Sequence, residues 1–192
     1  MRTIQRGILV ALSCLAFPAG ASVARAALPS DAEPATAQHL MAAAETKAAA
    51  EHKNLLVDFG ASWCGNCKLF DRFWDDPQMH PLMTRVFERV TLDINETDKR
   101  HPETPGAYEV LHSLGGGKDS GLPYLAMATA GGKLIIASEK KSGDWKSGIG
   151  YPDAPDEIEW WMHMLQTAAP SLSKQEMSDI KIWLQAHSTH PR

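Results

Sequence analysis

The sequence is poor in cysteine and has no hydrophobic run long enough to cross a membrane. Only three of its 192 residues are cysteine, so a fold held together by several disulfides is excluded. The apolar stretch at residues 7–17 is too short to span a bilayer as a helix. Acidic side chains outnumber basic ones, 23 to 19, and this balance argues against a nucleic-acid partner.

The first 26 residues have the pattern of a secretory signal peptide. Two arginines precede the apolar stretch at residues 7–17, and Ala24-Arg25-Ala26 fits a cleavage site of small residues. We expect cleavage near Ala26 and a periplasmic or secreted protein that is not integral to the membrane once processed. A cut after Ala21, a retained N-terminal anchor and a lipoprotein modified at Cys14 are the alternatives.

Removal of this segment would leave a mature chain with just two cysteines, Cys64 and Cys67. A disulfide that closes so short a loop constrains the unfolded chain little, so a purely stabilising bridge is the weaker interpretation. Zinc needs about four ligands, and no histidine stands at a convincing companion spacing. We therefore expect no metal and no cofactor, with zinc binding and copper delivery by the pair as minor alternatives.

The two cysteines lie where a predicted strand meets a predicted helix. Residues 55–61 form an apolar run typical of a buried strand, and residues 67–74 have helical spacing. Unpartnered N–H groups and the helix dipole at such a junction favour a thiolate at Cys64. Cys67 stands three residues later on the same helix face and can reach the Cys64 sulfur. The pattern predicts thiol–disulfide exchange in which Cys64 attacks and Cys67 resolves.

The remaining sequence indicates one domain over residues 27–192, with a helical C-terminal extension from about residue 156. Helical patterns cover residues 35–53, 82–89, 107–114, 156–167 and a last segment that opens with the capping pair Ser173 and Glu176. Strand patterns cover residues 90–94, 124–129 and 133–138. Trp160, Trp161 and Trp183 are expected to pack in the core of the C-terminal helices.

Two segments resemble the thioredoxin-like superfamily. Residues 57–68 read V-D-F-x-A-x-W-C-G-x-C-K, and Gly121-Leu122-Pro123 follows later. The sequence W-D-D-P-Q-M at residues 74–79, with V-T-L-D at 90–93, is similar to the C-terminal periplasmic domain of the transmembrane thiol-disulfide interchange reductase. The resemblance implies an α/β thioredoxin fold, a central mixed β-sheet flanked by helices, with an N-terminal helix and extra C-terminal helices.

The resemblance also implies roles for residues outside the cysteine pair. Asp58 would be a buried carboxylate that helps to move the proton of Cys67, with a pKa raised by poor solvation. Pro123 would be a cis-proline that faces the cysteines and leaves the backbone of Leu122 free to pair with a substrate strand. The lysine that partners this carboxylate in the family would fall at Thr91, so it is absent here.

Three residues next to the cysteines complete the expected site. Trp63 is expected to contact the substrate, while Gly65 and Asn66 set the redox poise. Asn66 is neither the proline of thioredoxins nor the histidine of many isomerases, and its lack of charge mildly disfavours a strongly oxidising pair. Cys67 is expected to be the more buried of the two cysteines.

These observations favour an exported oxidoreductase that exchanges disulfides with other proteins, and they favour a reductant of those disulfides over an oxidant. Its partners would be protein disulfide or dithiol substrates and a redox partner protein that supplies or accepts electrons. The alternative is a thioredoxin-fold binding module or chaperone in which the cysteines are dispensable. The long loops at residues 115–121 and 139–155 motivate that alternative, since they could border the site and select a partner.

Overall fold

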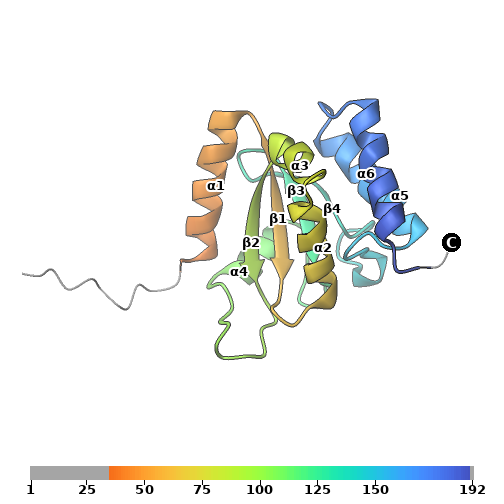
Figure 1. Ribbon diagram of the computed structural model, residues 1–192. Helices are drawn as coiled ribbons and strands as arrows, with labels where there is room; N and C mark the ends of the chain where they lie inside the picture. Colours follow the sequence, from red (N-terminus) through yellow and green to blue (C-terminus); the bar gives the residue numbers. More distant parts are fainter. Residues whose placement is uncertain (1–34, 191–192) are drawn as a thin grey trace, which may run out of the picture. The chain divides into compact units, whose positions relative to one another are not determined.

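The computed structural model describes residues 35–190, which form a four-stranded sheet with helices on both faces (Figure 1). The predicted signal peptide lies outside the described residues. In chain order the elements are α1 (Ala37–Glu51), β1 (Asn54–Gly60), α2 (Gly65–Asp75), α3 (His80–Val86), β2 (Phe87–Asp93), α4 (Ala107–Ser113), β3 (Tyr124–Ala128), β4 (Leu134–Ala137), the 3-10 helix η1 (Trp145–Ser147), α5 (Pro155–Ala168) and α6 (Lys174–His187).

The sheet is mixed, as predicted, with the strand order β2-β1-β3-β4. Strands β1 and β2 are parallel, while β3 is antiparallel to both β1 and β4. Helices α1 and α4 pack on one face, and α2, α3 and α5 pack on the other, with α6 against α5 (Figure 1). The thioredoxin-like architecture with added N-terminal and C-terminal helices is therefore confirmed.

Strand β1 lies in the interior of the sheet and is buried on both faces, which explains its nearly continuous apolar sequence. Leu55, Val57 and Phe59 join the core beneath α1 and α4. Because side chains alternate along a strand, Leu56 and Asp58 project toward the opposite face, where α2 lies. This alternation places an acidic side chain in the interior on the side of the cysteines.

The C-terminal helices share a core with α2 through an aromatic cluster. Trp161 is fully buried, and its ring packs edge-on against Phe70 and Phe73, with centroids 5.6 and 6.0 Å apart. Trp183 packs against Phe73 with centroids 5.4 Å apart. The predicted core packing of Trp161 and Trp183 is confirmed. Trp160 is partly buried at the edge of the same cluster.

One predicted boundary is wrong and has consequences for the site. The helix expected over residues 82–89 ends at Val86, and β2 begins at Phe87 rather than at Val90. Phe87 already pairs with Asn54 of β1, so strand pairing with a segment about 30 residues away overrides the local helical pattern.

Within residues 35–190, no helix combines the length and the hydrophobicity that crossing a bilayer requires.

Candidate redox site

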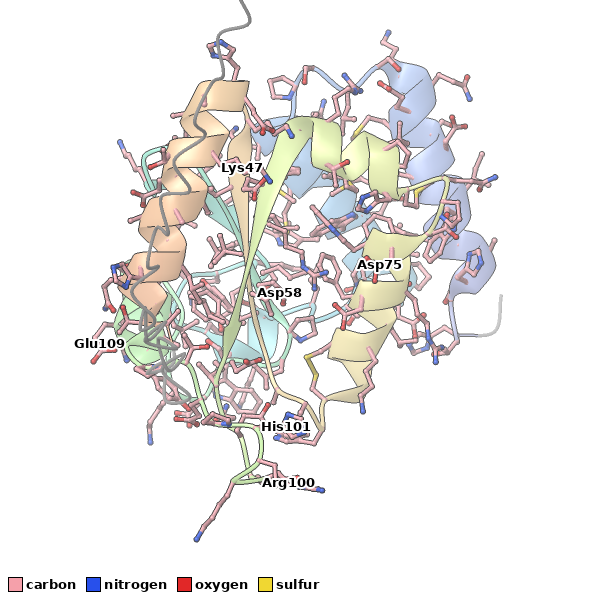
Figure 2. The ribbon with its side chains drawn as sticks, turned by 60° about the vertical axis from the view of Figure 1, so that its left-hand side comes forward. Lys47, Asp58, Asp75, Arg100, His101 and Glu109 are labelled. Atoms are coloured by element: carbon pink, nitrogen blue, oxygen red, sulfur yellow. A yellow bond between two sulfur atoms is a disulfide. The ribbon has the colours of Figure 1, made fainter. Side chains whose placement is uncertain are left out.

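The cysteines lie at the N-terminal end of α2, directly after the loop that follows β1. Cys64 is the N-cap residue of α2, and a disulfide joins it to Cys67, with Cα atoms 5.3 Å apart (Figure 2). The backbone N–H of Cys67 donates a hydrogen bond to the Cys64 sulfur at 3.1 Å. The same N–H and the helix dipole would stabilise negative charge on this sulfur once the disulfide is reduced.

The relative burial of the two cysteines differs from the expectation. Cys64 is 4% exposed, whereas Cys67 is partly exposed and borders a hollow of about 220 Å³. Gly60 has no side chain to cover the Cys67 sulfur on this side, whereas a Cβ atom at position 60 would lie 3.3 Å from that sulfur. The prediction that Cys67 is the more buried residue is therefore wrong for the disulfide-bonded state.

A second hollow, of about 450 Å³, opens beside Cys64, and we call it the cysteine hollow. It brings together all four of the predicted substrate-binding residues, namely Trp63, Gly65, Asn66 and Leu122. It also contains Ser120 and Gly121, from the loop that the sequence analysis expected to border the site, and Asn95, which that analysis missed. Asn95 comes from a loop distant in sequence, and no local pattern assigns it to the site.

The Leu122–Pro123 peptide bond is cis, as the resemblance implied. Pro123 is buried, while Leu122 is only partly buried and lines the cysteine hollow. The segment leads directly into β3, the neighbour of β1 in the sheet. The structure thus places Leu122, next to the cis-proline, on the border of the same hollow as Cys64.

Trp63 lies on the rim of the cysteine hollow with 54% of its surface exposed. Its indole N–H donates a hydrogen bond to the backbone carbonyl of Asn95 at 2.8 Å. An exposed and tethered indole offers a flat apolar surface to a partner at little further loss of conformational entropy. Trp63 is therefore not a core aromatic residue.

Asp58 is almost completely buried, at 3% exposed, in the interior between the sheet and α2 (Figure 2). Burial raises the pKa of its carboxyl to about 6, against the opposing effect of the nearby Arg89 guanidinium. Arg89 donates hydrogen bonds to Oδ2 of Asp58 from Nε, at 3.2 Å, and from Nη2. The other oxygen, Oδ1, has no hydrogen-bond partner among residues 35–190.

Arg89 is a further residue of the site that the sequence analysis missed. Thr91 does pair with Asp58 across the strands, as expected, but the cation stands two residues earlier on β2, on the same face. The lysine expected at position 91 from the family pattern is indeed absent, and Arg89 provides the cationic partner of Asp58 instead. A strand beginning at Phe87 would have revealed Arg89, because residues 89 and 91 then face the same side.

Three further contacts hold the Arg89 guanidinium in place. It donates a hydrogen bond from Nη2 to Asp71 at 2.6 Å, and it lies over the rings of Phe70 and Trp74, 5.2 and 5.3 Å from their centroids. Stacking on aromatic faces suits the planar guanidinium better than an ammonium group. Arg89 and Asp58 border the same hollow as Cys67. Cys64 thus borders the cysteine hollow, and Cys67 borders the hollow that contains the ionisable pair.

Among residues 35–190, no three histidine, cysteine or acidic side chains are grouped so that they could hold a metal ion.

Comparison with known proteins agrees with this description. The family model described as thioredoxin-like matches residues 36–130. Similar solved structures include a disulphide isomerase from Xylella fastidiosa Temecula1, with 22% identity over 82% of this chain and 96% of that chain and a TM-score of 0.47. A DsbH oxidoreductase has 18% identity over 71% of this chain and 83% of that chain, with a TM-score of 0.45.

The oxidised C-terminal domain of DsbD from Neisseria meningitidis has 22% identity over 69% of this chain and 98% of that chain, with a TM-score of 0.40. No curated protein matches the sequence significantly. The family match begins just before α1 and ends within the β3–β4 hairpin, so it includes the cysteine pair, Asp58 and the cis-proline. Residues 36–130 therefore form a thioredoxin-like domain.

Proposed function

We propose that this protein is an exported thiol–disulfide oxidoreductase that reduces disulfides in other proteins. The observation that carries the proposal is the Cys64–Cys67 disulfide at the start of α2, beside a hollow that the backbone of Leu122 also borders. The signal-peptide pattern of the first 26 residues supports export. The absence of any other cysteine from the remaining sequence supports a catalytic rather than a scaffolding role for the pair.

The first chemical step uses the reduced protein. The Cys64 thiolate attacks one sulfur of a substrate disulfide, which forms a mixed disulfide and releases the other substrate sulfur as a thiolate that takes up a proton. The substrate chain lies extended along Gly121 and Leu122 and pairs with their backbone. Trp63 covers the outer side of the substrate at the rim of the hollow.

The second step releases the product. The Cys67 thiol gives its proton to the Asp58 carboxylate, which borders the same hollow and whose pKa of about 6 suits a base near neutral pH. The Cys67 thiolate then attacks the Cys64 sulfur, the second substrate thiolate leaves, and the Cys64–Cys67 disulfide forms again. Two electrons and two protons from a redox partner protein restore the dithiol for the next cycle.

The direction of electron flow rests on Asn66, which carries no charge between the cysteines, and on the resemblance to a reducing domain. Equilibration of the pair with glutathione buffers measures its reduction potential. A potential near or below about −270 mV supports a reductant, and a potential near about −120 mV would show an oxidant instead.

A trapping experiment tests the exchange chemistry itself. In a Cys67→Ala variant the mixed disulfide cannot be resolved, so covalent partners should accumulate on Cys64 and be released by dithiothreitol. A Cys64→Ala variant is the matched control and should trap none. If neither variant traps partners and the intact protein turns over no disulfide, the enzymatic proposal fails.

A binding module or chaperone with dispensable cysteines is the second candidate. The observation that favours it is the loop after β4, which returns to the cysteine hollow. A Cβ atom at Gly150 would lie 3.4 Å from the Leu122 carbonyl oxygen and 3.6 Å from the Asn66 side-chain nitrogen. A Cys64→Ser, Cys67→Ser double variant should keep full biological activity under this hypothesis, and loss of complementation would exclude it.

A further inference from the structure

A third hollow, of about 380 Å³, lies next to the cysteine hollow, and the two share Ser120 on their borders. Gly117, Glu139 and Trp145 also line this third hollow, which we call the Glu139 subsite. Glu139 comes from the chain after β4, and Ser120 comes from the loop before the cis-proline. The Glu139 subsite therefore extends the groove along the segment on which a substrate strand would pair.

Glu139 carries the one feature of this hollow that points to a ligand. Its side chain is 5% exposed, and its Oε1 accepts a hydrogen bond from the Ser120 hydroxyl at 2.5 Å. The Ser120 oxygen itself accepts from the backbone N–H of Gly117 at 2.9 Å. Oε2 of Glu139 is buried and has no hydrogen-bond partner among residues 35–190. Because an unpaired buried carboxylate oxygen costs free energy, a donor from a ligand would stabilise this site.

The other groups around the hollow favour a cation. Lys118 and Asp119 are exposed and pair with each other, with 3.9 Å between Nζ and Oδ1, so water screens both charges. His112 borders the hollow from the exposed end of α4. Trp145 is 53% exposed, and a lysine ammonium already sits 5.5 Å from its ring centroid, that of the adjacent Lys146. Glu139 and Trp145 line the same hollow, and a carboxylate together with an open indole face is a combination that binds ammonium or guanidinium groups.

We propose that the Glu139 subsite receives a lysine or arginine side chain of the substrate polypeptide, close in sequence to the cysteine that Cys64 attacks. This inference rests on the proposed function, since it assigns a substrate class to the same groove. An extended chain advances roughly 3.3 Å per residue, and Ser120 stands two residues before Leu122. A basic residue within about three positions of the reactive cysteine would therefore reach Glu139, and its charge would displace Lys146 from the Trp145 ring.

The test uses a series of peptides whose cysteine is joined to thionitrobenzoate. Attack on the peptide cysteine sulfur releases the dye and links the peptide to Cys64, whereas attack on the dye sulfur releases the peptide and links the dye to Cys64, and mass spectrometry distinguishes the two adducts. The peptides carry lysine, norleucine or glutamate at each position from three before to three after the cysteine. With reduced wild-type protein, lysine at one or two of these positions should give at least about tenfold faster formation of the mixed disulfide than norleucine, and glutamate should be slower than both. Equal rates for the three series would overturn the proposal.

Variants locate the effect. Glu139→Gln keeps the shape of the side chain and should abolish the preference for lysine, and Trp145→Ala should weaken it without affecting the fold. Asp119→Asn removes an exposed carboxylate from the same hollow and should keep the preference. A preference that survives Glu139→Gln, or that disappears in Asp119→Asn alone, would contradict the assignment.

A binding measurement separates this inference from the proposed function. In the Cys64→Ser, Cys67→Ser variant, calorimetry compares every lysine peptide, with its cysteine replaced by serine, with its norleucine counterpart, and lysine at one or two positions should bind at least about tenfold more tightly. That difference should vanish when Glu139→Gln is added. If no peptide disulfide reacts with the wild-type protein, the proposed function fails, while the calorimetry still decides whether the Glu139 subsite binds a cation.

Discussion

Both hydrogen bonds that Arg89 donates to Asp58 end on one carboxylate oxygen, Oδ2, and none reaches the other oxygen from residues 35–190. The guanidinium offsets part of the cost of burying the charge, and the remaining cost keeps the pKa at about 6. A fully paired carboxylate would stay ionised and be a weak base, and an unpaired one would stay protonated. The one-sided pairing leaves Asp58 able to exchange a proton near neutral pH.

Replacing Arg89 by methionine should raise the pKa of Asp58 further and shift the acid limb of mixed-disulfide resolution to higher pH. Methionine retains an apolar stem over the rings of Phe70 and Trp74 but removes the charge. At pH 7 the loss should cost about 3–5 kcal/mol of stability, because a buried charge loses its partner. Rapid-quench kinetics between pH 5 and pH 9 and urea unfolding measure the two effects.

Arg85→Met is the matched control for this variant. Arg85 pairs with Glu176 at the surface, where its side chain is 46% exposed, so its loss should change stability by no more than about 1 kcal/mol. The pH profile of resolution should be unchanged in the control. An unshifted profile in Arg89→Met would show that the guanidinium does not tune the carboxyl.

Asp58 should make the oxidised protein less stable as the pH rises. Its pKa is about 6 in the folded state and 3.8 in the reference state, so the folded protein holds this proton more tightly between those values. The free energy of unfolding therefore falls from about pH 4 to about pH 6 and stays lower above that, by on the order of 3 kcal/mol.

Asp58→Asn should remove this pH dependence. The free energy of unfolding of the wild type minus that of the variant, measured from pH 4 to pH 8, should therefore fall as the pH rises. Asp75, which is exposed on α2 (Figure 2), provides the control Asp75→Asn, and that variant should keep the wild-type slope. A difference curve that is flat, or that rises with pH, would refute the assignment of the raised pKa to Asp58.

Gly60→Ala should destabilise the oxidised protein by about 1–3 kcal/mol, because the added Cβ would lie 3.3 Å from the Cys67 sulfur, which the disulfide to Cys64 holds in place. Gly65→Ala is the control, since no atom outside its chain neighbours and helix backbone lies within 4 Å of a Cβ placed there. Urea unfolding of both oxidised variants makes the comparison. Equal stability of the two variants would show that the sulfur can shift without cost.

Trp161→Ala should cost about 3–5 kcal/mol of stability, because its fully buried ring joins α5 to the aromatic residues of α2. Trp145→Ala, at an exposed position, should change stability by no more than about 0.5 kcal/mol. Thermal unfolding of both variants is the measurement. A small effect at Trp161 would mean that the C-terminal helices contribute little to the core.

The sequence predicts the elements around the cysteines to within one or two residues, because their signals are local. An apolar run, a cysteine pair and helical spacing follow one another over about 20 residues, and β1 and α2 form there as expected. The cis bond before Pro123 could be anticipated only from the family resemblance, since the dipeptide itself carries no such signal.

Arg89 and Glu139 could not be predicted in the same way, because their environments depend on strand pairing. Arg89 meets Asp58 only through the register of β2 on β1, which the misplaced start of β2 concealed. Glu139 meets Ser120 through the β3–β4 pairing, which returns the chain across 19 positions. Such contacts have no periodicity in the sequence, so a local pattern does not reveal them.

Two backbone hydrogen bonds join the two ends of the loop after β4. Ile149 donates a hydrogen bond to the Ser138 carbonyl at 3.1 Å, and Lys140 donates one to the Ser147 carbonyl at 3.1 Å. The enclosed segment, residues 141–146, can therefore vary in length or composition while Glu139 and Gly150 stay in place. Under the proposed function, the end of this loop could therefore vary to suit other partners while the cysteine pair stays unchanged.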